Sequence, residues 1–492
     1  MTTWFDVTTI LGWHRPAVGI IRTEAECAAY ALTRISNGED VKFCSFNGAS
    51  GYVDVSADHV ASTLKRISGS HLAVATIVSN QGQHKKSLEA RLKEVALKVT
   101  SRLPTKISGL LYQFFQRRRT AIIEGVMALR YLRSAMLSFM KPASNSHVVM
   151  KVKTDLNIAE NPFSKGDCYI SVGLDWDNKD LVYLYKLKKF MGMKVVLCCY
   201  DVIPVRLPHL CVGDVAAKFA NYFTDVAWCA DKIICISECT RKDLQLLLSE
   251  LGAPEPAMSV IKLGCHVSQD VASVMGPEVV SLMKNKYILF VSTIERRKNH
   301  EVLYRAYTRL IDKGVTDLPQ LVFVGMSGWG VNDFLKDLDL DPRTKSYIRV
   351  LNNISDSDLV HLYKNCQMTA FPSLYEGWGL PVVESLAAGK FCLASNAASI
   401  PEAGQDFIEY LDPWDVSVWA DRIEWYVSHP DELLLKEKNI RENYVVTSWK
   451  GAAVSVFEAV ESPVAPFLKS VTGQRDAEAF EKRVNDIQCK ND

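Results

Sequence analysis

The sequence predicts an α/β protein in which strands alternate with helices. Short apolar runs at residues 4–11, 287–292 and 368–371 are each followed by a loop and then by apolar residues at helical spacing. A strand, a loop and a helix in this order form the opening of a Rossmann-like unit. At 492 residues, the chain is long enough for two or three domains with separate cores.

The most informative stretch is residues 371–389, in which a strand end is followed by a loop containing Gly377 and Gly379. Leu380 and Pro381 begin the next helix, where the missing N–H of a proline costs nothing. Backbone N–H groups at such a helix start point at one spot, and the helix dipole there favours negative charge. The stretch therefore predicts a phosphate site.

Two carboxylates frame this loop: Glu376 lies before it, and Glu384 lies eight residues later, about one turn inside the helix. A carboxylate can accept hydrogen bonds from two neighbouring sugar hydroxyls. Glutamates on either side of a phosphate site indicate a ligand with a sugar at each end, which is the form of a nucleotide-sugar. The alternative is a loop glutamate and a solvated helix glutamate with no shared role.

The pattern F-P-S-x-x-E-G-x-G-L-P-x-x-E in this stretch resembles the donor-site signature of the retaining glycosyltransferases of family 4. The resemblance implies the GT-B fold, in which two Rossmann-like domains face a cleft. It also implies that Glu376 lies by the transferred sugar and that Glu384 binds the ribose. Gly377, Gly379 and the helix start would then line the donor site.

The first unit is expected to consist of a strand over residues 4–11, a glycine-containing loop and a helix. The run Arg15-Pro16-Ala17-Val18-Gly19-Ile20-Ile21-Arg22 resembles the first loop of a family 4 branch that acts on bacterial surface polysaccharides. The resemblance makes Gly19 and Arg22 candidates for the acceptor or phosphate side of the site. Arg22 fits a solvated helix position equally well.

A helix-rich segment over residues 80–145 interrupts the α/β pattern. Within it, residues 85–141 carry thirteen Lys or Arg and three Glu, so their net charge is 13 − 3 = +10. Basic residues interleaved with leucine and aromatic residues are typical of a helix at a membrane surface. Two interpretations remain open: peripheral contact with an anionic membrane, or a helical insertion docked on its own domain.

The α/β pattern resumes at residue 168, and a strand over residues 194–200 leads into Asp201-Val202-Ile203-Pro204. Open parallel sheets bind their ligands at such carboxyl ends. The segment resembles a His-Asp-x-Ile-Pro motif of the same branch, with Tyr200 in place of histidine. The resemblance makes Asp201 the acceptor-side catalytic candidate and adds His209 on that side. A strand-end cap is the alternative role for Asp201.

A helix over 214–231 and a strand over 258–263 complete the first domain. The expected divisions are an N-terminal acceptor domain over 1–275 with the helical insertion at about 80–145, a C-terminal nucleotide-sugar donor domain over 276–448, and, over 449–492, a helix that crosses back to the first domain plus a charged tail.

Three cations, Arg296, Arg297 and Lys298, follow the first strand of the second domain. Such a cluster is usually a solvated edge. The resemblance instead places it at the donor diphosphate, where positive charge holds the ligand and stabilises it as a leaving group. Lys298 matches the family lysine, and Arg297 is the second candidate. Ser292-Thr293 stands where many family members have Gly-Arg, so one usual phosphate contact is missing.

Two more loops are expected to line the nucleotide. A strand over 321–325 ends in a loop containing Gly325, which should face the nucleotide. Asn353 precedes a helix cap at a position that, in the family, passes the edge of the base.

Composition limits the other functions. The net charge of +1 gives no global field for nucleic acid. The thirteen cysteines include no C-x-x-C pair, which predicts reduced thiols and no zinc site. We expect neither a signal peptide nor a membrane span. The expected location is the cytoplasm, at the inner face of the cell membrane if residues 85–141 bind lipid.

The resemblance implies a hexosyltransferase that acts with retention in surface polysaccharide synthesis, such as that of O-antigen. Its substrates would be a nucleotide-sugar, with GDP-mannose the first expectation, and a saccharide or lipid-linked saccharide acceptor. No metal and no further cofactor are expected, although Asp175-Trp176-Asp177 has the letters of a D-x-D motif. The alternatives are a GT-B epimerase of nucleotide-sugars, which needs no acceptor, and a non-catalytic scaffold associated with a membrane.

Overall fold

The computed structural model describes residues 1–14, 19–48, 50–77, 160–211, 213, 215–265 and 275–462, with the backbone alone for 68–77. Two compact units divide the chain, residues 1–71 with 154–492 and residues 72–153. The predicted insertion over 80–145, its basic part 85–141, the loop 15–18 and the tail from 465 lie outside the described residues. No helix within the described ranges is long and apolar enough to cross a membrane.

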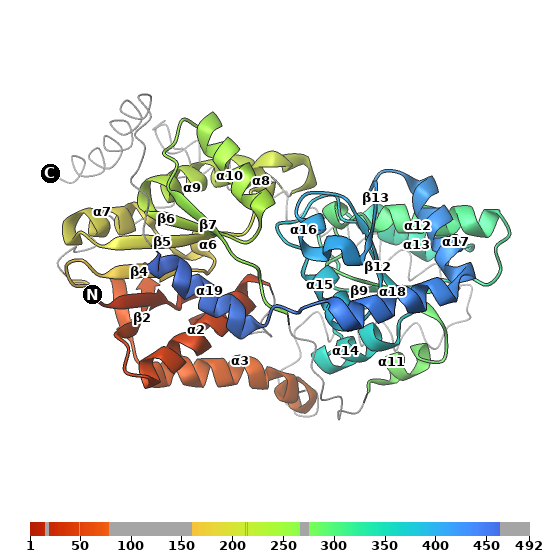
Figure 1. Ribbon diagram of the computed structural model, residues 1–492, viewed down its shortest axis with the longest axis horizontal. Helices are drawn as coiled ribbons and strands as arrows, with labels where there is room; N and C mark the ends of the chain where they lie inside the picture. The colour runs from red at the N-terminus through yellow and green to blue at the C-terminus, as the bar shows by residue number, and fades with distance from the viewer. Residues whose placement is uncertain are drawn as a thin grey trace, which may run out of the picture. The chain divides into compact units, whose positions relative to one another are not determined.

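The N-terminal half of the larger unit is built on a seven-stranded sheet with the order β3-β2-β1-β4-β5-β6-β7, which is parallel except for the antiparallel pair β2 and β3 (Figure 1). Its strands are β1 (Thr3–Asp6), β2 (Val41–Asn47), β3 (Gly51–Val55), β4 (Cys168–Ser171), β5 (Lys194–Cys199), β6 (Lys232–Cys235) and β7 (Ala257–Val260). The helices of this half are α1 (Thr8–Leu11), α2 (Ile20–Ser36), α3 (Ala57–Ile77), α6 (Asp175–Asn178), α7 (Leu181–Met191), α8 (Ile203–Arg206), η1 (Pro208–Leu210), α9 (Val215–Cys229) and α10 (Glu238–Glu250).

The C-terminal half holds a six-stranded parallel sheet with the order β10-β9-β8-β11-β12-β13. Its strands are β8 (Tyr287–Val291), β9 (Gln320–Val324), β10 (Ile348–Leu351), β11 (Met368–Phe371), β12 (Cys392–Ser395) and β13 (Glu409–Leu411). The helices are α11 (Pro277–Leu282), η2 (Arg296–Lys298), α12 (His300–Asp312), α13 (Asn332–Leu340), α14 (Asp356–Asn365), α15 (Leu380–Ala387), α16 (Ile400–Gly404), η3 (Gln405–Phe407), α17 (Val416–Ser428) and α18 (Pro430–Asn443). The last described helix, α19 (Trp449–Glu461), packs on the N-terminal half. Two parallel sheets with intervening helices confirm the predicted α/β class and its two Rossmann-like domains.

The first strand is shorter than the sequence predicts. It ends at Asp6, whose Oδ1 accepts the N–H of Thr8 at 2.9 Å and so forms the local turn that aspartate favours. The next residues, Thr8–Leu11, form a short helix instead of continuing the strand. The antiparallel edge strand β3 was not expected either, because a five-residue edge strand gives only a weak periodic signal.

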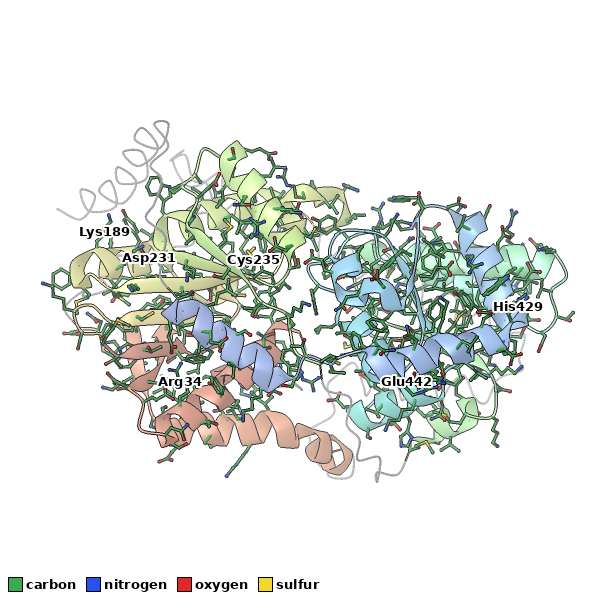
Figure 2. All side chains as sticks on the ribbon, viewed as in Figure 1. Arg34, Lys189, Asp231, Cys235, His429 and Glu442 are labelled. Atoms are coloured by element: carbon green, nitrogen blue, oxygen red, sulfur yellow. The ribbon has the colours of Figure 1, made fainter. Side chains whose placement is uncertain are left out.

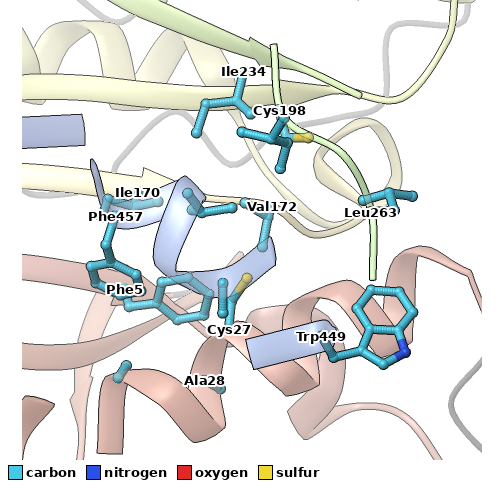
Figure 3. Packing of buried hydrophobic residues seen from close by; sticks show 14 of the residues in the cluster. Phe5, Cys27, Ala28, Ile170, Val172, Cys198, Ile234, Leu263, Trp449 and Phe457 are labelled. Atoms are coloured by element: carbon cyan, nitrogen blue, oxygen red, sulfur yellow. The ribbon is translucent and has the colours of Figure 1, made fainter. Parts of the chain in front are cut away.

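Helix α19 completes the core of the N-terminal half although it lies at the far end of the sequence. Phe457 stacks on Phe5 with ring centroids 5.9 Å apart, and Trp449, Ala453 and Val456 belong to the same cluster (Figure 3). At the helix surface, Arg34 of α2, which is labelled in Figure 2, forms an ion pair with Glu461 at 2.6 Å. Burial of a large aromatic side chain contributes about 2–3 kcal/mol, so α19 is an integral part of this half.

A buried group of charges lies where β1 and β4 end. Lys179 pairs with Asp6 at 2.9 Å and with Asp175 at 2.8 Å. Glu24 of α2 is fully buried beside them, and its Oε1 accepts the N–H of Ile10 at 3.0 Å. Burial raises the pKa of Glu24 to about 8, because Lys179, already shared by two aspartates, lowers it too little to compensate. Glu24 is therefore protonated at neutral pH.

Replacing Glu24 with glutamine should flatten the pH dependence of stability. The folded protein holds the Glu24 proton up to about pH 8, whereas the unfolded chain releases it near pH 4.5. The stability linked to this proton is fully present below pH 4.5. As the pH rises from 4.5 to 8, the free energy of unfolding falls by about 1.4 kcal/mol per pH unit. Denaturant unfolding from pH 5 to 8 measures it. The exposed Glu301→Gln is the control, and parallel curves for Glu24→Gln and wild type would contradict the assignment.

Candidate functional site

The candidate site lies at the carboxyl edge of the C-terminal sheet, where the loops that follow β8 and β11 meet. These two strands are neighbours in the sheet, so their carboxyl ends lie side by side. The N–H of Leu374 donates to the carbonyl of Arg297 at 2.8 Å, and Asn299 Nδ2 donates to the carbonyl of Pro372 at 3.1 Å. The backbone thereby holds the two loops together before any charged side chain contributes.

Glu376 is clamped between the two predicted cations. Lys298 Nζ lies 2.6 Å from Glu376 Oε1, and Arg297 Nη1 lies 2.9 Å from Oε2. The carboxylate is 8% exposed, so solvent screens these pairs little. The structure thus brings three of the sequence-predicted residues into direct contact.

The electrostatics keep Glu376 ionised. Burial alone would raise the pKa of Glu376, but Arg297 and Lys298 outweigh it and lower the pKa to about 2. Burial, with the neighbouring Arg297, lowers the pKa of Lys298 in spite of Glu376. A buried carboxylate that is ionised at neutral pH and held by two cations can bind sugar hydroxyls once a ligand anion takes over those cations.

Two residues that the sequence analysis did not single out complete this cluster. Glu295 Oε1 lies 2.8 Å from Arg297 Nη2, and Arg297 Nη1 also donates to the carbonyl of Tyr375 at 2.7 Å. The guanidinium is thereby fixed on both sides. The only sequence signal for Glu295 is its position two residues before an arginine, which is too common to single out a residue.

Two of the predicted glycines are required by close backbone approaches. A Cβ on Gly377 would lie 2.2 Å from the carbonyl oxygen of Tyr200, just after β5. A Cβ on Gly325, after β9, would lie 1.9 Å from the carbonyl oxygen of Ser292. Both distances are below any real Cβ contact, so these positions admit only glycine.

The candidate Asp201 lies near this cluster. Its Oδ1 accepts the N–H of Ile203 at 3.0 Å and closes a local turn after β5, which agrees with the strand-end role considered as the alternative for it. Burial raises the pKa of Asp201, while Arg297 lowers it and Glu376 raises it, so the three charges influence one another. His209 is exposed in η1, and its carbonyl accepts a 3.5 Å hydrogen bond from Arg296.

Of the other candidates, Arg22 lies near Glu384. Arg22 Nη2 lies 3.3 Å from Asp356 and is close enough to Glu384 to lower the pKa of that glutamate. Arg22 is thus placed beside the predicted ribose residue, and no contact joins it to Lys298 among the described residues. The remaining donor-site and first-loop candidates lie at element ends: Gly379 at the N-cap of α15, Leu380 and Pro381 in its first turn, Asn353 after β10, and Gly19 at the N-cap of α2.

Nothing in the described part of the chain has the form of a metal centre. No group of three or more His, Cys, Asp or Glu side chains is arranged to hold an ion there. In the D-x-D sequence, Asp175 pairs with the buried Lys179, and Asp177 pairs with Lys218 at 2.9 Å.

Comparison with known proteins identifies the half of the chain that carries this cluster. Residues 277–444 match the family model described as glycosyl transferases group 1, and the match includes Lys298, Glu376 and Glu384. Over these residues the chain is similar to the group 1 glycosyl transferases. The predicted resemblance to a glycosyltransferase family is confirmed over this part of the chain.

Curated relatives of the chain include two proteins of Escherichia coli. The serotype-specific mannosyltransferase WbdA is 26% identical over 305 residues, which are 59% of this chain and 36% of WbdA. The O-antigen chain mannosyltransferase B is 31% identical over 200 residues, which are 39% of this chain and 51% of that protein. The chain therefore spans between about a third and a half of the length of these relatives.

A solved structure supports the fold over most of the chain. The glycosyltransferase from Rickettsia africae ESF-5 superposes with a TM-score of 0.50 at 14% identity, covering 94% of this chain and 98% of that one. At this identity the likeness concerns the fold, and it agrees with the predicted GT-B architecture.

The buried charges should be strongly coupled in stability. Glu376→Gln leaves Lys298 without its ion-pair partner and Arg297 with Glu295 alone, and should cost about 3 kcal/mol. Lys298→Met should cost less because Arg297 still pairs with Glu376. The double variant should lose less free energy of unfolding than the two single variants lose together. Guanidinium unfolding at pH 7 measures the cycle. The exposed Arg305–Glu301 pair is the control, with an expected coupling below about 1 kcal/mol; additivity at Lys298 and Glu376 would contradict the coupling.

Proposed function

We propose that the protein is a retaining glycosyltransferase that moves a hexose from a nucleotide-sugar to a saccharide acceptor, with GDP-mannose as the first donor to test. The observation that carries the proposal is the clamp of Arg297 and Lys298 on Glu376, with Glu384 eight residues further on. The names of the E. coli relatives support mannose and a surface polysaccharide such as O-antigen.

Donor binding exchanges one anion for another at the two cations. In the free protein, Glu376 pairs with both Arg297 and Lys298, and Glu295 pairs with Arg297 as well. The diphosphate of the donor brings at least two negative charges and competes for both cations, since phosphate oxygens accept strong charge-assisted hydrogen bonds. Glu376 is then released toward the hydroxyls of the transferred sugar, while Glu384 accepts hydrogen bonds from the ribose.

The transfer step needs no protein nucleophile. The bond between the anomeric carbon and the phosphate oxygen breaks, and a bond from the same carbon to the acceptor oxygen forms on the same face. The acceptor proton passes to the departing phosphate oxygen, and the product is a nucleoside diphosphate. Lys298 and Arg297 stabilise the negative charge that develops on the leaving group. Asp201, which lies near Arg297, is proposed for the acceptor side.

The acceptor is proposed to be a saccharide or a lipid-linked saccharide. Residues 85–141, with their net charge of +10, would draw a lipid-linked acceptor to an anionic membrane at the inner face of the cell. A GT-B epimerase would use the same donor residues but consume no acceptor. A membrane scaffold would bind vesicles and leave nucleotide-sugars unchanged.

The donor should be identifiable from stabilisation and slow hydrolysis. Purified protein incubated singly with GDP-mannose, UDP-glucose, UDP-galactose and dTDP-rhamnose should show a raised Tm with one of them, because a ligand that binds only the folded state stabilises it. Hydrolysis of that donor to the nucleoside diphosphate and free sugar supports transfer. Release of an epimerised nucleotide-sugar would favour the epimerase. Vesicle binding without any response to the donors would favour the scaffold.

Glu376→Gln should separate catalysis from nucleotide binding. Without the carboxylate charge, kcat for donor hydrolysis or transfer should fall by about 10²–10³-fold, the typical loss for one preorganised electrostatic group. Binding of the nucleoside diphosphate should persist, because Lys298 and Arg297 remain. Steady-state rates and calorimetric titration measure the two quantities. Glu301→Gln is the matched control, and an unchanged kcat in Glu376→Gln would overturn the site assignment.

A further inference from the structure

A buried tyrosine contacts the second glutamate of the candidate site. Tyr363 of α14 donates from its Oη to Glu384 Oε2 of α15 at 2.9 Å (both helices are labelled in Figure 1). Tyr363 is 2% exposed and belongs to the same buried cluster as Leu362, Cys366 and Val279, so its ring is enclosed by packed side chains. Burial and Glu384 both raise the pKa of Tyr363, so the hydroxyl keeps its proton and acts as a donor.

The remaining charged and titratable groups that face Glu384 are few. Arg22 from α2 lowers the pKa of Glu384, Asp356 from α14 raises it, and Cys265 lies close enough for its own pKa to be raised by Glu384. Burial dominates and lifts the pKa of Glu384 to about 7, even with the hydrogen bond from Tyr363. At neutral pH this glutamate is balanced between its acid and its carboxylate, and each donor to Oε2 moves that balance.

We propose that Tyr363 is a positioning residue for the nucleotide: its hydroxyl occupies Glu384 Oε2 and thereby presents an ionised Oε1 to the two ribose hydroxyls of the donor. No hydrogen bond joins Oε1 to another residue in the described part of the chain. Its two lone pairs match a vicinal diol, which offers two donors. The inference rests on the proposed function, because it assigns a partner to the proposed ribose residue.

A purely structural tyrosine predicts a different result from a positioning one. If Tyr363 served only to pack α14 against α15, its loss would weaken nucleotide binding by the same factor at every pH. If it favours the ionised form of Glu384, its loss matters most where that group titrates. Above the pKa that Glu384 has in wild type and in Tyr363→Phe, this carboxylate is ionised in both proteins, and their affinities for the nucleotide converge.

The test titrates wild type, Tyr363→Phe and Tyr307→Phe calorimetrically with GDP, UDP, dTDP and ADP between pH 6 and 9. Tyr307 is the matched control, a fully buried tyrosine of α12 whose hydroxyl donates to the carbonyl of Pro319 at 3.2 Å. For Tyr363→Phe we expect an upward shift of about one unit in the midpoint of the pH profile, and therefore about fivefold weaker binding at pH 7, nearly tenfold weaker binding at pH 6 and convergence with wild type near pH 9. Tyr307→Phe should keep the wild-type profile.

A second measurement keeps the proposal independent of folding defects. In a Glu384→Gln background, the affinity for nucleoside diphosphates should not depend on the ionisation of residue 384 in this pH range. Adding Tyr363→Phe should then weaken binding no further, because no carboxylate remains whose ionisation Tyr363 could favour. An equal loss at all pH values, or the same loss in the Glu384→Gln background, would overturn the proposal while leaving the proposed function intact. Absence of binding of any nucleoside diphosphate by wild type would overturn the proposed function and this inference with it.

Discussion

The ion cluster of Glu376, Arg297 and Lys298 is the interaction on which the proposed site depends. Two cations so little exposed would repel each other and lose hydration, and Glu376 offsets both costs from a loop 78 residues further along the chain. The cluster also joins the loops after β8 and β11, which define the carboxyl edge of the C-terminal sheet. The ion pairs of the free protein and the proposed affinity for a diphosphate thus depend on the same two cations.

The two glutamates of the donor motif show how environment separates residues of one type. Glu376 has two cations within 3 Å, and its pKa falls to about 2. Glu384 has a neutral phenol on one oxygen and a more distant arginine, so burial wins and its pKa rises to about 7. One is a permanent anion, and the other is sensitive to pH and to its neighbours.

The sequence was sufficient for the α/β class, the two Rossmann-like units and the motif residues, because these depend on local periodicity and on fixed spacing along the chain. It was not sufficient for the end of β1, where the side chain of Asp6 starts a turn, or for the edge strand β3. Tyr363 and Glu295 were also missed. Tyr363 follows an ordinary helical pattern and acquires its role only when α14 packs beside α15, which no sequence spacing records. The position of Arg22 beside Asp356 likewise depends on tertiary structure.

Helix α19 has a consequence for how the protein is made. The N-terminal core contains Phe5 and also Phe457, so the first domain to leave the ribosome cannot complete its core until almost all of the described chain has been synthesised. At about 5–20 residues per second, that interval is roughly 20–90 s. During this time the apolar face that later receives Trp449 and Phe457 stays uncovered in the nascent chain. Because the two parts of this core lie at opposite ends of the described chain, we expect the nascent protein to need chaperones during translation.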